Sequence, residues 1–177
     1  VEVKKQIMSR HDLTKDEKNE ALHKAASAED DDEERTIQIV SLLLEKGAEV
    51  NSVEEQHAFP THQTALHNAA NRLKKNTISL LIQKGADVNL KSSKGETALH
   101  QAVIVPDLSE YRTIECVKRL VESKAEINAT DTNGFTALHA AIFKGKKKTC
   151  IQLLSHEADG MVACKNGWTG LTGSLYW

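Results

Sequence analysis

A four-residue phrase that recurs along the chain limits its fold more than any other feature. Thr64–His67, Thr97–His100 and Thr136–His139 all read Thr-Ala-Leu-His. An earlier copy, Glu20–His23, begins with Glu, and a later one, Thr169–Thr172, reads Thr-Gly-Leu-Thr. The three identical copies begin 33 and 39 residues apart. A phrase that returns at such intervals indicates an array of stacked structural repeats.

A second phrase follows each copy and marks the end of one unit. In its best copies it carries Ala, an acidic residue, a β-branched residue and Asn after the first position. The copies are Gly47–Asn51, Gly85–Asn89, Lys124–Asn128 and the weaker Glu157–Met161. The first position is where a helix ends in the left-handed conformation that glycine adopts easily. Lys124 and Glu157 should therefore each cost about 1 kcal/mol relative to glycine.

Together the two phrases resemble the repeat signature of the ankyrin family. The words Thr-Pro-Leu-His-x-Ala-Ala and Leu-Leu-x-x-Gly-Ala-Asp-Val-Asn of that family are matched nearly letter for letter over residues 15–171, with Ala in place of Pro. The resemblance implies an all-α fold. We expect an ankyrin-repeat solenoid of about four helix-turn-helix repeats with β-hairpin-like fingers, followed by a partial fifth repeat.

The spacing of the phrases also predicts the domain organisation. Residues 1–13 form an N-terminal extension and residues 14–177 the ankyrin repeat domain, whose first helix starts at a capping box, Thr14–Glu17. The repeats cover about 17–51, 61–89, 94–128 and 133–161, with a partial repeat at 166–177. Repeats one and three carry six extra residues between their helices, and we expect these insertions to project from the edge opposite the fingers. The finger at 53–63 is enlarged.

Composition excludes several classes of function. A net charge of −2 gives no overall attraction to nucleic acid or an anionic membrane, and no apolar run is long enough for membrane insertion. Cys116, Cys150 and Cys164 have no metal-like spacing. Free thiols in a core indicate a reducing compartment, so we expect a cytoplasmic protein, with the nucleus as a second option. We also expect a monomer that needs no cofactor.

One histidine per repeat stands at the same place in the phrase. These residues are His23, His67, His100 and His139. Such a row could indicate a metal ladder or a proton relay. Packed helices are about 10 Å apart, however, whereas metal–ligand bonds are about 2 Å long. The ankyrin resemblance implies that these histidines tie loops together by hydrogen bonds, and we expect no metal site.

Two charged runs have structural interpretations. The six acids of Glu29–Glu34 lack the alternating ligands and central Gly of a calcium-binding EF-hand loop, and we expect a solvated turn. Lys144 and Lys146–Lys148 form a basic turn, but a nucleic-acid patch needs interleaved aromatic residues and more positive charge. The chain has no nucleophile elbow, phosphate loop or paired zinc-ligand motif, so no catalytic set emerges.

These observations favour a non-catalytic interaction module that binds an unknown protein or peptide. The alternative is a targeting or regulatory ankyrin segment of a larger enzyme or channel. The chain begins at Val1 rather than Met, and its fifth repeat is cut off, which keeps this alternative open. A longer reading frame with a catalytic or membrane segment would favour the alternative.

Three asparagines close the second phrase in repeats one to three. Asn51, Asn89 and Asn128 each follow an acid and a β-branched residue, with Leu eight positions earlier. This pattern resembles the ankyrin sites that an iron- and 2-oxoglutarate-dependent asparaginyl hydroxylase accepts. The competing interpretation is that these side chains fasten the finger turns, as Asn commonly does.

The partner-binding positions are expected to be the exposed ones, because packing fixes the others. The ankyrin resemblance implies that they are the finger residues before the Thr and the two residues after the Ala pair. The finger set is Lys91, Ser93, Glu96, Thr130, Thr132, Phe135, Asn166 and Trp168, and the helix set is Asn71, Arg72, Phe143 and Lys144.

Two aromatic residues stand out in this set. Phe135 and Trp168 occupy a position that is Gln63 or Glu96 in other repeats, so the core does not require an aromatic side chain there. Exposed aromatics beside Arg or Lys are typical of an interaction hot spot. Burial of Trp168 against the end of the stack is the competing interpretation. We expect a partner of acidic or mixed character, which meets Lys144, in the concave groove across repeats three to five.

Overall fold

The fold is described from a computed structural model, in which residues 13–29, 32–54, 61–106 and 110–173 are described. These ranges hold nine helices and no β-strand, apart from isolated bridges between Val53 and Thr64 and between Ala163 and Thr169. The helices are α2 (Lys15–Ser27), α3 (Glu33–Glu45), α4 (Ala65–Asn71), α5 (Lys75–Gln83), α6 (Ala98–Ile104), α7 (Tyr111–Glu122), α8 (Ala137–Phe143), α9 (Lys147–Ser155) and α10 (Gly170–Gly173).

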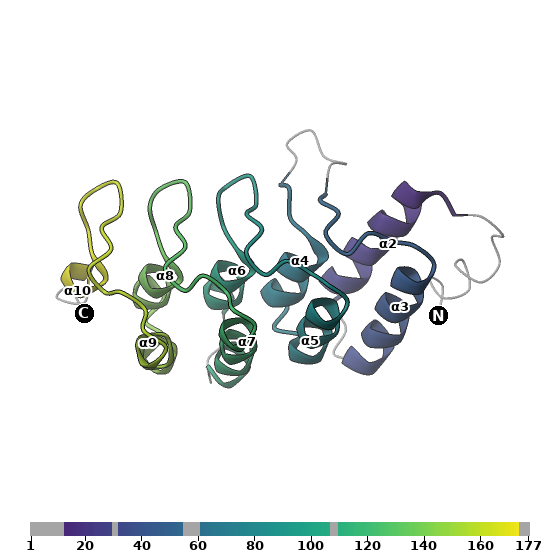
Figure 1. Cartoon of the computed structure of the whole chain (residues 1–177). Helices are drawn as coiled ribbons and strands as arrows, with labels where there is room; N and C mark the ends of the chain where they lie inside the picture. Colours follow the sequence, from purple (N-terminus) through teal and green to yellow (C-terminus); the bar gives the residue numbers. More distant parts are fainter. Residues whose placement is uncertain (1–12, 30–31, 55–60, 107–109, 174–177) are drawn as a thin grey trace.

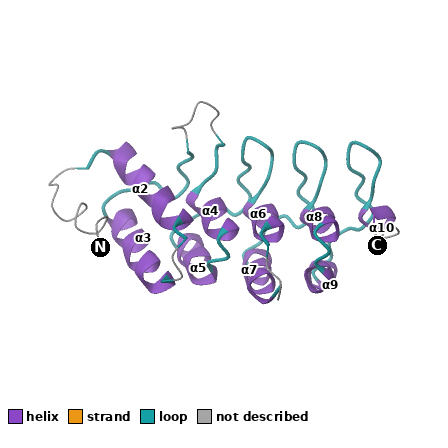
Figure 2. Ribbon diagram, turned by 180° about the vertical axis from the view of Figure 1, so that it is seen from behind, coloured by secondary structure: helices purple, strands orange, loops and turns teal. Residues whose placement is uncertain are grey.

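The helices form two layers in a single row (Figures 1 and 2). In the first layer α2, α4, α6, α8 and α10 pack in that order, and in the second layer α3, α5, α7 and α9 do the same. Fingers rise from the first layer between successive helix pairs (Figure 1). The pairs α2–α3, α4–α5, α6–α7 and α8–α9 are repeats one to four, and α10 begins a fifth. This is the all-α solenoid that the sequence predicts.

Reciprocal caps start the first-layer helices. The Thr14 hydroxyl accepts the N–H of Glu17, whose carboxylate accepts the N–H of Thr14, so the predicted capping box is confirmed. In α4 the partner of the capping Thr64 is His67 rather than an acid: Nδ1 of His67 accepts the Thr64 N–H at 3.1 Å. Each cap satisfies main-chain donors that a helix start would otherwise leave unpaired.

Each second-layer helix ends in a left-handed residue, as the second phrase predicts. Gly47 and Gly85 have φ of +91° and +92°, and Lys124 and Glu157 both have φ of +67°. Side chains beyond glycine are strained in this region, so repeats three and four end less favourably than repeats one and two.

The core is a continuous strip between the two layers. In the first layer the Leu of the first four phrases is buried (Leu22, Leu66, Leu99 and Leu138), and in the second layer Leu43, Leu81, Leu120 and Leu153 are fully buried. Cys116 is fully buried in this core, whereas Cys150 is half-buried at its margin. Burial raises the pKa of Cys116 to about 12 and that of Cys150 to about 11, so both thiols stay protonated.

Several expectations fall outside the described residues. These are the N-terminal extension up to residue 12, the middle of each insertion (30–31 and 107–109), the tip of the enlarged finger (55–60) and the final residues 174–177. The described part of the acidic run is not only a turn, because Asp32 caps α3 and Glu33 and Glu34 form its first turn.

Candidate interaction surface

The fingers are joined to one another by main-chain hydrogen bonds. Within each finger the chain folds back on itself, as in the 2.9 Å bond from the Asp131 N–H to the Phe135 carbonyl oxygen. Between fingers, the Thr132 N–H donates to the Lys94 carbonyl oxygen and the Lys165 N–H to that of Asn133, both at 2.9 Å. The fingers therefore form a ladder whose members support each other.

Two glycines make this close stacking feasible. Gly95 and Gly134 have φ of +74° and +82°. A Cβ atom on Gly95 would lie 2.8 Å from the main-chain nitrogen of Thr132, and one on Gly134 would lie 3.0 Å from Cα of Cys164. Both the conformation and the space thus require glycine.

Buried histidines of the first-layer helices form hydrogen bonds to the main chain of the fingers. Nε2 of His67 lies 3.0 Å from the Glu96 carbonyl oxygen, and Nε2 of His139 lies 3.3 Å from that of Trp168. In both residues Nδ1 accepts the N–H of the capping Thr, so Nε2 carries the proton and donates. The expectation that these histidines tie loops together is confirmed.

The first histidine of the row has a different partner. Nε2 of His23 lies 3.2 Å from Oγ of Ser52. Its Nδ1 is buried without a hydrogen bond, 3.9 Å from a carboxylate oxygen of Glu54, because Glu20 lies within α2 rather than at a helix start, where the N–H of the capping Thr is available in the later copies. Burial lowers the pKa of His23, His67 and His100 below the ordinary 6.5, since a buried imidazolium loses its hydration. A lowered pKa favours the neutral form of these three rings.

The predicted finger residues lie along the ladder with differing exposure. Six are exposed: Lys91, Ser93, Thr132, Phe135, Asn166 and Trp168. Glu96 and Thr130 are half-buried and already engaged. The Glu96 carboxylate accepts a hydrogen bond of 2.9 Å from Gln101 Nε2, and the Thr130 carbonyl oxygen accepts one of 2.9 Å from Lys91 Nζ.

The predicted helix residues divide between repeats two and four. Asn71 and Arg72 are half-buried: Asn71 Nδ2 donates to Gln101 Oε1 at 3.1 Å, and Arg72 pairs with Glu29 at 3.2 Å. Phe143 is 74 % exposed, and Lys144 next to it is also exposed. Repeat four therefore offers the more accessible pair.

One histidine joins the two aromatic residues of the finger set. The Phe135 ring packs edge-on against His139, with centroids 5.7 Å apart and an interplanar angle of 76°. His139 in turn hydrogen-bonds the main chain of Trp168. Phe135 is 36 % exposed and Trp168 is 55 % exposed, so Trp168 is not enclosed at the end of the stack.

Two lysines that resemble surface residues are in fact buried. Lys74 and Lys146 are each 5 % exposed. Their Nζ atoms donate to the hydroxyls of Thr36 and Thr113 in the preceding repeat, both at 3.0 Å. The predicted basic turn is therefore wrong for Lys146, whose ammonium is turned inward onto hydrogen-bond acceptors. The alternation of Thr and Lys at one repeat position is the signal that could have revealed this pairing.

Sequence reasoning also missed two carboxylates that cap helices of the following repeat. Oε1 of Glu33 accepts the N–H groups of Asn76 and Thr77 at 2.7 and 2.9 Å, at the start of α5. Oε2 of Glu110 accepts the N–H of Thr149 at 2.8 Å, at the start of α9. A carboxylate is favoured at a helix N-terminus by both the dipole and the unpaired donors.

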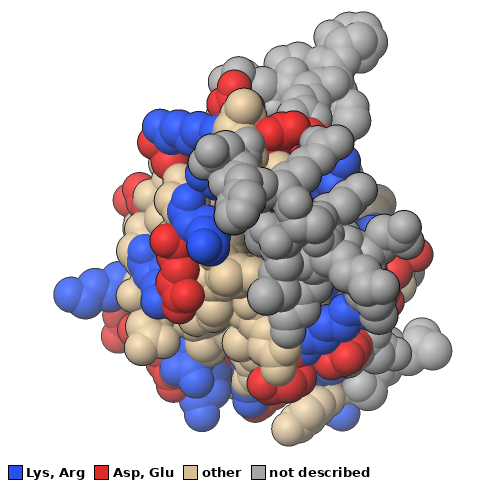
Figure 3. Space-filling view, turned by 90° about the vertical axis from the view of Figure 1, so that its right-hand side faces the viewer, with Lys and Arg blue, Asp and Glu red and all other residues tan. Residues whose placement is uncertain are grey.

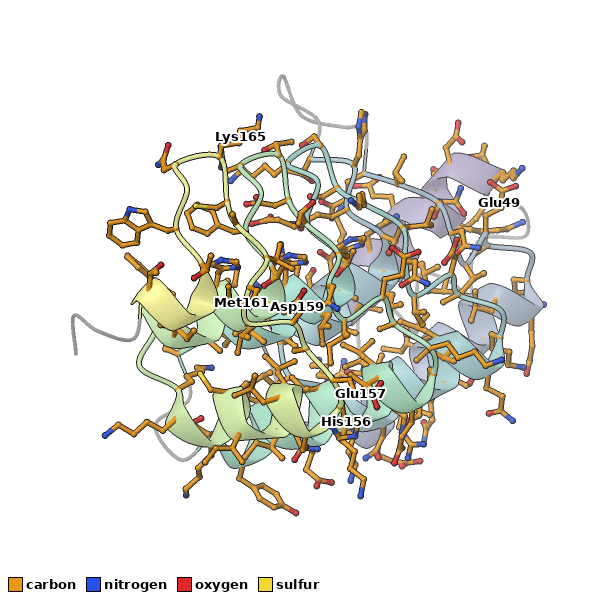
Figure 4. All side chains as sticks on the ribbon, turned by 60° about the vertical axis from the view of Figure 1, so that its left-hand side comes forward. Glu49, His156, Glu157, Asp159, Met161 and Lys165 are labelled. Atoms are coloured by element: carbon orange, nitrogen blue, oxygen red, sulfur yellow. The ribbon has the colours of Figure 1, made fainter. Side chains whose placement is uncertain are left out.

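The three candidate hydroxylation sites connect neighbouring repeats. Oδ1 of Asn51, Asn89 and Asn128 accepts a main-chain N–H of the next repeat at 2.9, 2.8 and 2.8 Å; the donors are Asp87, Glu126 and Asp159. Met161 takes this place in repeat four, and Figure 4 shows it beside Asp159 on the connection that follows α9. The asparagines thus fasten repeats as well as turns.

A cavity of about 470 Å³ lies at the turns between the helices of repeats two and three. The charged side chains that line it already have partners: Lys75 pairs with Glu115 at 2.8 Å, and Glu33 caps α5.

Within the described ranges, no three His, Cys, Asp or Glu side chains are placed to hold a metal, and no helix is long and apolar enough to cross a membrane. Acidic and basic side chains are interspersed where the N-terminal end is described (Figure 3).

Comparison with known proteins agrees with this architecture. A family model described as ankyrin repeats (3 copies) matches residues 33–108, and one described as ankyrin repeats (many copies) matches residues 107–155. A search of curated proteins found no match. The two models together cover more than half of the sequence, and the chain belongs to the ankyrin repeat family.

Proposed function

We propose that the chain is a non-catalytic interaction module, which binds a protein or peptide through the concave face and fingers of repeats three to five. Ankyrin repeats are generally protein–protein interaction modules. The observation that carries the finer proposal is the exposure of Phe135 and Trp168 around His139, with Phe143 and Lys144 exposed on the same repeat.

The construction of this surface supports a binding function. Interaction hot spots are rich in aromatic and cationic side chains. The finger ladder and the buried histidines already fix the main chain here, so a partner would not have to order it. Lys144 and Lys165 are exposed near this face, which favours a partner of acidic or mixed character.

Affinity capture from a cell extract tests the proposal. The bait is the whole chain, captured proteins are identified by mass spectrometry, and Phe135→Ala serves as the parallel bait. The proposal expects at least one protein captured by the unchanged chain and depleted with the variant. Identical sets of captured proteins from two folded baits would contradict it.

In this proposal, the cysteines indicate the cellular compartment of the protein. All three are free thiols, which fits a cytoplasmic protein in a reducing compartment. A monomer is expected, and sedimentation equilibrium measures this directly.

A targeting or regulatory ankyrin segment of a larger enzyme or channel is the second candidate, with Asn51, Asn89 or Asn128 as hydroxylase substrates. Asn51 and Asn128 are exposed, which favours access, whereas their bonds to the next repeat would have to open. Incubation with an asparaginyl hydroxylase, iron, oxygen and 2-oxoglutarate should add one oxygen atom to a peptide that contains one of these residues. Unchanged peptide masses for all three would end the idea.

A further inference from the structure

Hydrogen bonds in both directions close the junction between repeats one and two at the starts of their second-layer helices. The Glu33 carboxylate of repeat one accepts the N–H groups of Asn76 and Thr77 at the start of α5. In the opposite direction, the Lys74 ammonium of repeat two donates to the Thr36 hydroxyl at 3.0 Å, and Lys74 is only 5 % exposed. We call this reciprocal pair of contacts, a carboxylate from one repeat and an ammonium from the next, a clasp.

The junction between repeats three and four carries a second clasp of the same kind. Oε2 of Glu110 accepts both the N–H and the hydroxyl group of Thr149 at the start of α9, each at 2.8 Å. The Lys146 ammonium, also 5 % exposed, donates to the Thr113 hydroxyl at 3.0 Å. The two clasps therefore join the repeats in pairs, one with two and three with four.

The junction between repeats two and three lacks both residues that form a clasp. Positions are compared by counting back from the left-handed residue that ends each second-layer helix. Asn71 of repeat two stands where repeats one and three have Glu33 and Glu110. Thr113 of repeat three stands where repeats two and four have their buried lysine. Neither the carboxylate nor the ammonium is thus available at this junction.

More exposed contacts and a cavity occupy this place instead. Lys75 pairs with Glu115 at 2.8 Å, with side chains that are 39 % and 30 % exposed. Nη2 of the exposed Arg112 donates to the Arg72 carbonyl oxygen at 3.1 Å. An ion pair with this exposure contributes little to stability, because water and salt screen it. The cavity of about 470 Å³ lies at the same point, between the starts of α5 and α7.

The first layer and the fingers, in contrast, are continuous across this junction. α4 packs against α6, and His67 forms its hydrogen bond to the Glu96 carbonyl oxygen. The Ser93 N–H donates to the Thr61 carbonyl oxygen of the preceding finger at 2.9 Å. Figure 1 shows α5 and α7 on the side of the array away from the fingers. A bend here can therefore move the start of α7 away from that of α5 while the first layer stays packed.

We propose that the junction between repeats two and three is a hinge, at which the starts of α5 and α7 separate. Repeats one and two move as one clasped pair, and repeats three and four as the other. The movement changes the curvature of the array and the angle between the fingers of the two pairs. The hinge does not depend on the proposed binding face, so either proposal can fail without the other.

Cys116 is a natural reporter of this opening, because it is fully buried on α7. Its pKa is raised chiefly by burial, and the charges of Glu33 and Lys75 in repeats one and two also act on the thiol. Thr77 stands at the same position of α5 and is also fully buried. Its hydroxyl has no hydrogen-bond partner among the described residues. Thr77→Cys therefore places a matched thiol at the clasped junction without removing a hydrogen bond.

The test measures both thiols in one sample of the folded Thr77→Cys chain. N-ethylmaleimide labels the cysteines, peptide mass spectrometry follows each one, and each rate is divided by that of the same thiol in the urea-unfolded chain. The Cys116 thiol should react about tenfold faster than the introduced thiol, because only the introduced thiol lies behind a clasp. Fraying from the end of the array would give the opposite order, since Thr77 lies nearer its N-terminal end.

A pair of lysine variants tests whether the ion pair across the junction holds the hinge closed. Lys75→Gln removes the contact to Glu115 and should speed Cys116 labelling about threefold. Lys147→Gln is the matched control, because Lys147 stands at the same position of α9 and is exposed. It should leave the rate unchanged. Circular dichroism melting shows whether each variant is folded.

Several outcomes would overturn the hinge. Equal normalised rates for the two thiols, or faster labelling of the introduced one, would show that the junction between repeats two and three is not the weaker one. Equal effects of the two lysine substitutions would show that the ion pair does not control the opening. Hydrogen exchange of the α7 main-chain amides at the rate of Cys116 labelling would show that α7 unfolds rather than moves.

Discussion

Nε2 of His100 lies 3.0 Å from the main-chain carbonyl oxygen of Phe135, a residue 35 positions further along the chain. Nδ1 of the same ring accepts the N–H of Thr97 at 3.2 Å. One buried ring therefore caps its own helix and holds the finger of the next repeat. The position of the exposed Phe135 ring depends on this hidden hydrogen bond.

Replacement of His100 by Ala should destabilise the fold. The Thr97 N–H and the Phe135 carbonyl group would lose their partner in a site that is 3 % exposed. Each unsatisfied buried group costs about 1–3 kcal/mol, and water entering the gap would recover part of it. Urea unfolding measures the loss, and a loss below about 0.5 kcal/mol would show that the bond is unimportant.

Stability should fall as the solution is acidified. Burial lowers the pKa of His23, His67 and His100 from 6.5, so the unfolded chain binds more protons than the folded one. The contribution of the neutral rings is fully present above the unfolded pKa and is lost as pH drops below it. Each ring can contribute a slope of at most about 1.4 kcal/mol per pH unit.

Thermal melts between about pH 7.5 and about pH 5.5 measure this dependence, because few carboxylates titrate there. His67→Gln should flatten the curve, since an amide does not titrate in this window. A midpoint that stays constant across the window in the unchanged chain would contradict the prediction.

Lys124→Gly and Glu157→Gly should each stabilise the chain by about 1 kcal/mol, because both residues have φ of +67°. Glu122→Gly is the control: it lies two positions before Lys124, in the last turn of α7, and should destabilise by up to about 1 kcal/mol. Denaturant midpoints that shift in the same direction for Lys124→Gly and Glu122→Gly would show that backbone conformation is not the cause.

Glu33→Ala should cost about 1–2 kcal/mol, because two N–H groups at the start of α5 would lose their acceptor. Glu34 is a close control, since it lies in the same first turn of α3 and is exposed. Both substitutions remove a charge near the α3 N-terminus, so the hydrogen bonds of Glu33 to the start of α5, including one from Asn76 Nδ2 at 3.0 Å, distinguish them. Equal losses for the two variants in chemical denaturation would show that this cap contributes nothing.

The repeat phrases predicted the features that are encoded locally. Thr64 and His67 sit in one phrase, and a left-handed helix end is a property of one residue such as Lys124, so spacing alone located them. The inward turn of Lys146 depends on Thr113 in another repeat. A sequence pattern within one repeat cannot predict a hydrogen bond between side chains of two different repeats.

The candidate surface was predicted as a set of positions but not as an arrangement. Phe135 was recognised because an aromatic residue replaces Glu96 at its position. Its packing on His139, and the engagement of Glu96 by Gln101, arise from contacts between side chains that no spacing rule specifies. The exposure of Leu154 likewise depends on which helices follow α9 in space.

The most direct test of the proposed function is the equilibrium affinity of the captured partner for three proteins: the unchanged chain, Phe135→Ala and Tyr111→Ala. Tyr111 is 67 % exposed on α7, beside the cavity at the helix turns, and serves as the aromatic control. Phe135→Ala should weaken binding by about 1–2 kcal/mol or more while the free energy of unfolding stays within about 1 kcal/mol. Tyr111→Ala should bind as the unchanged chain does. Normal binding by Phe135→Ala, or unfolding of this variant, would contradict the assignment of the binding face.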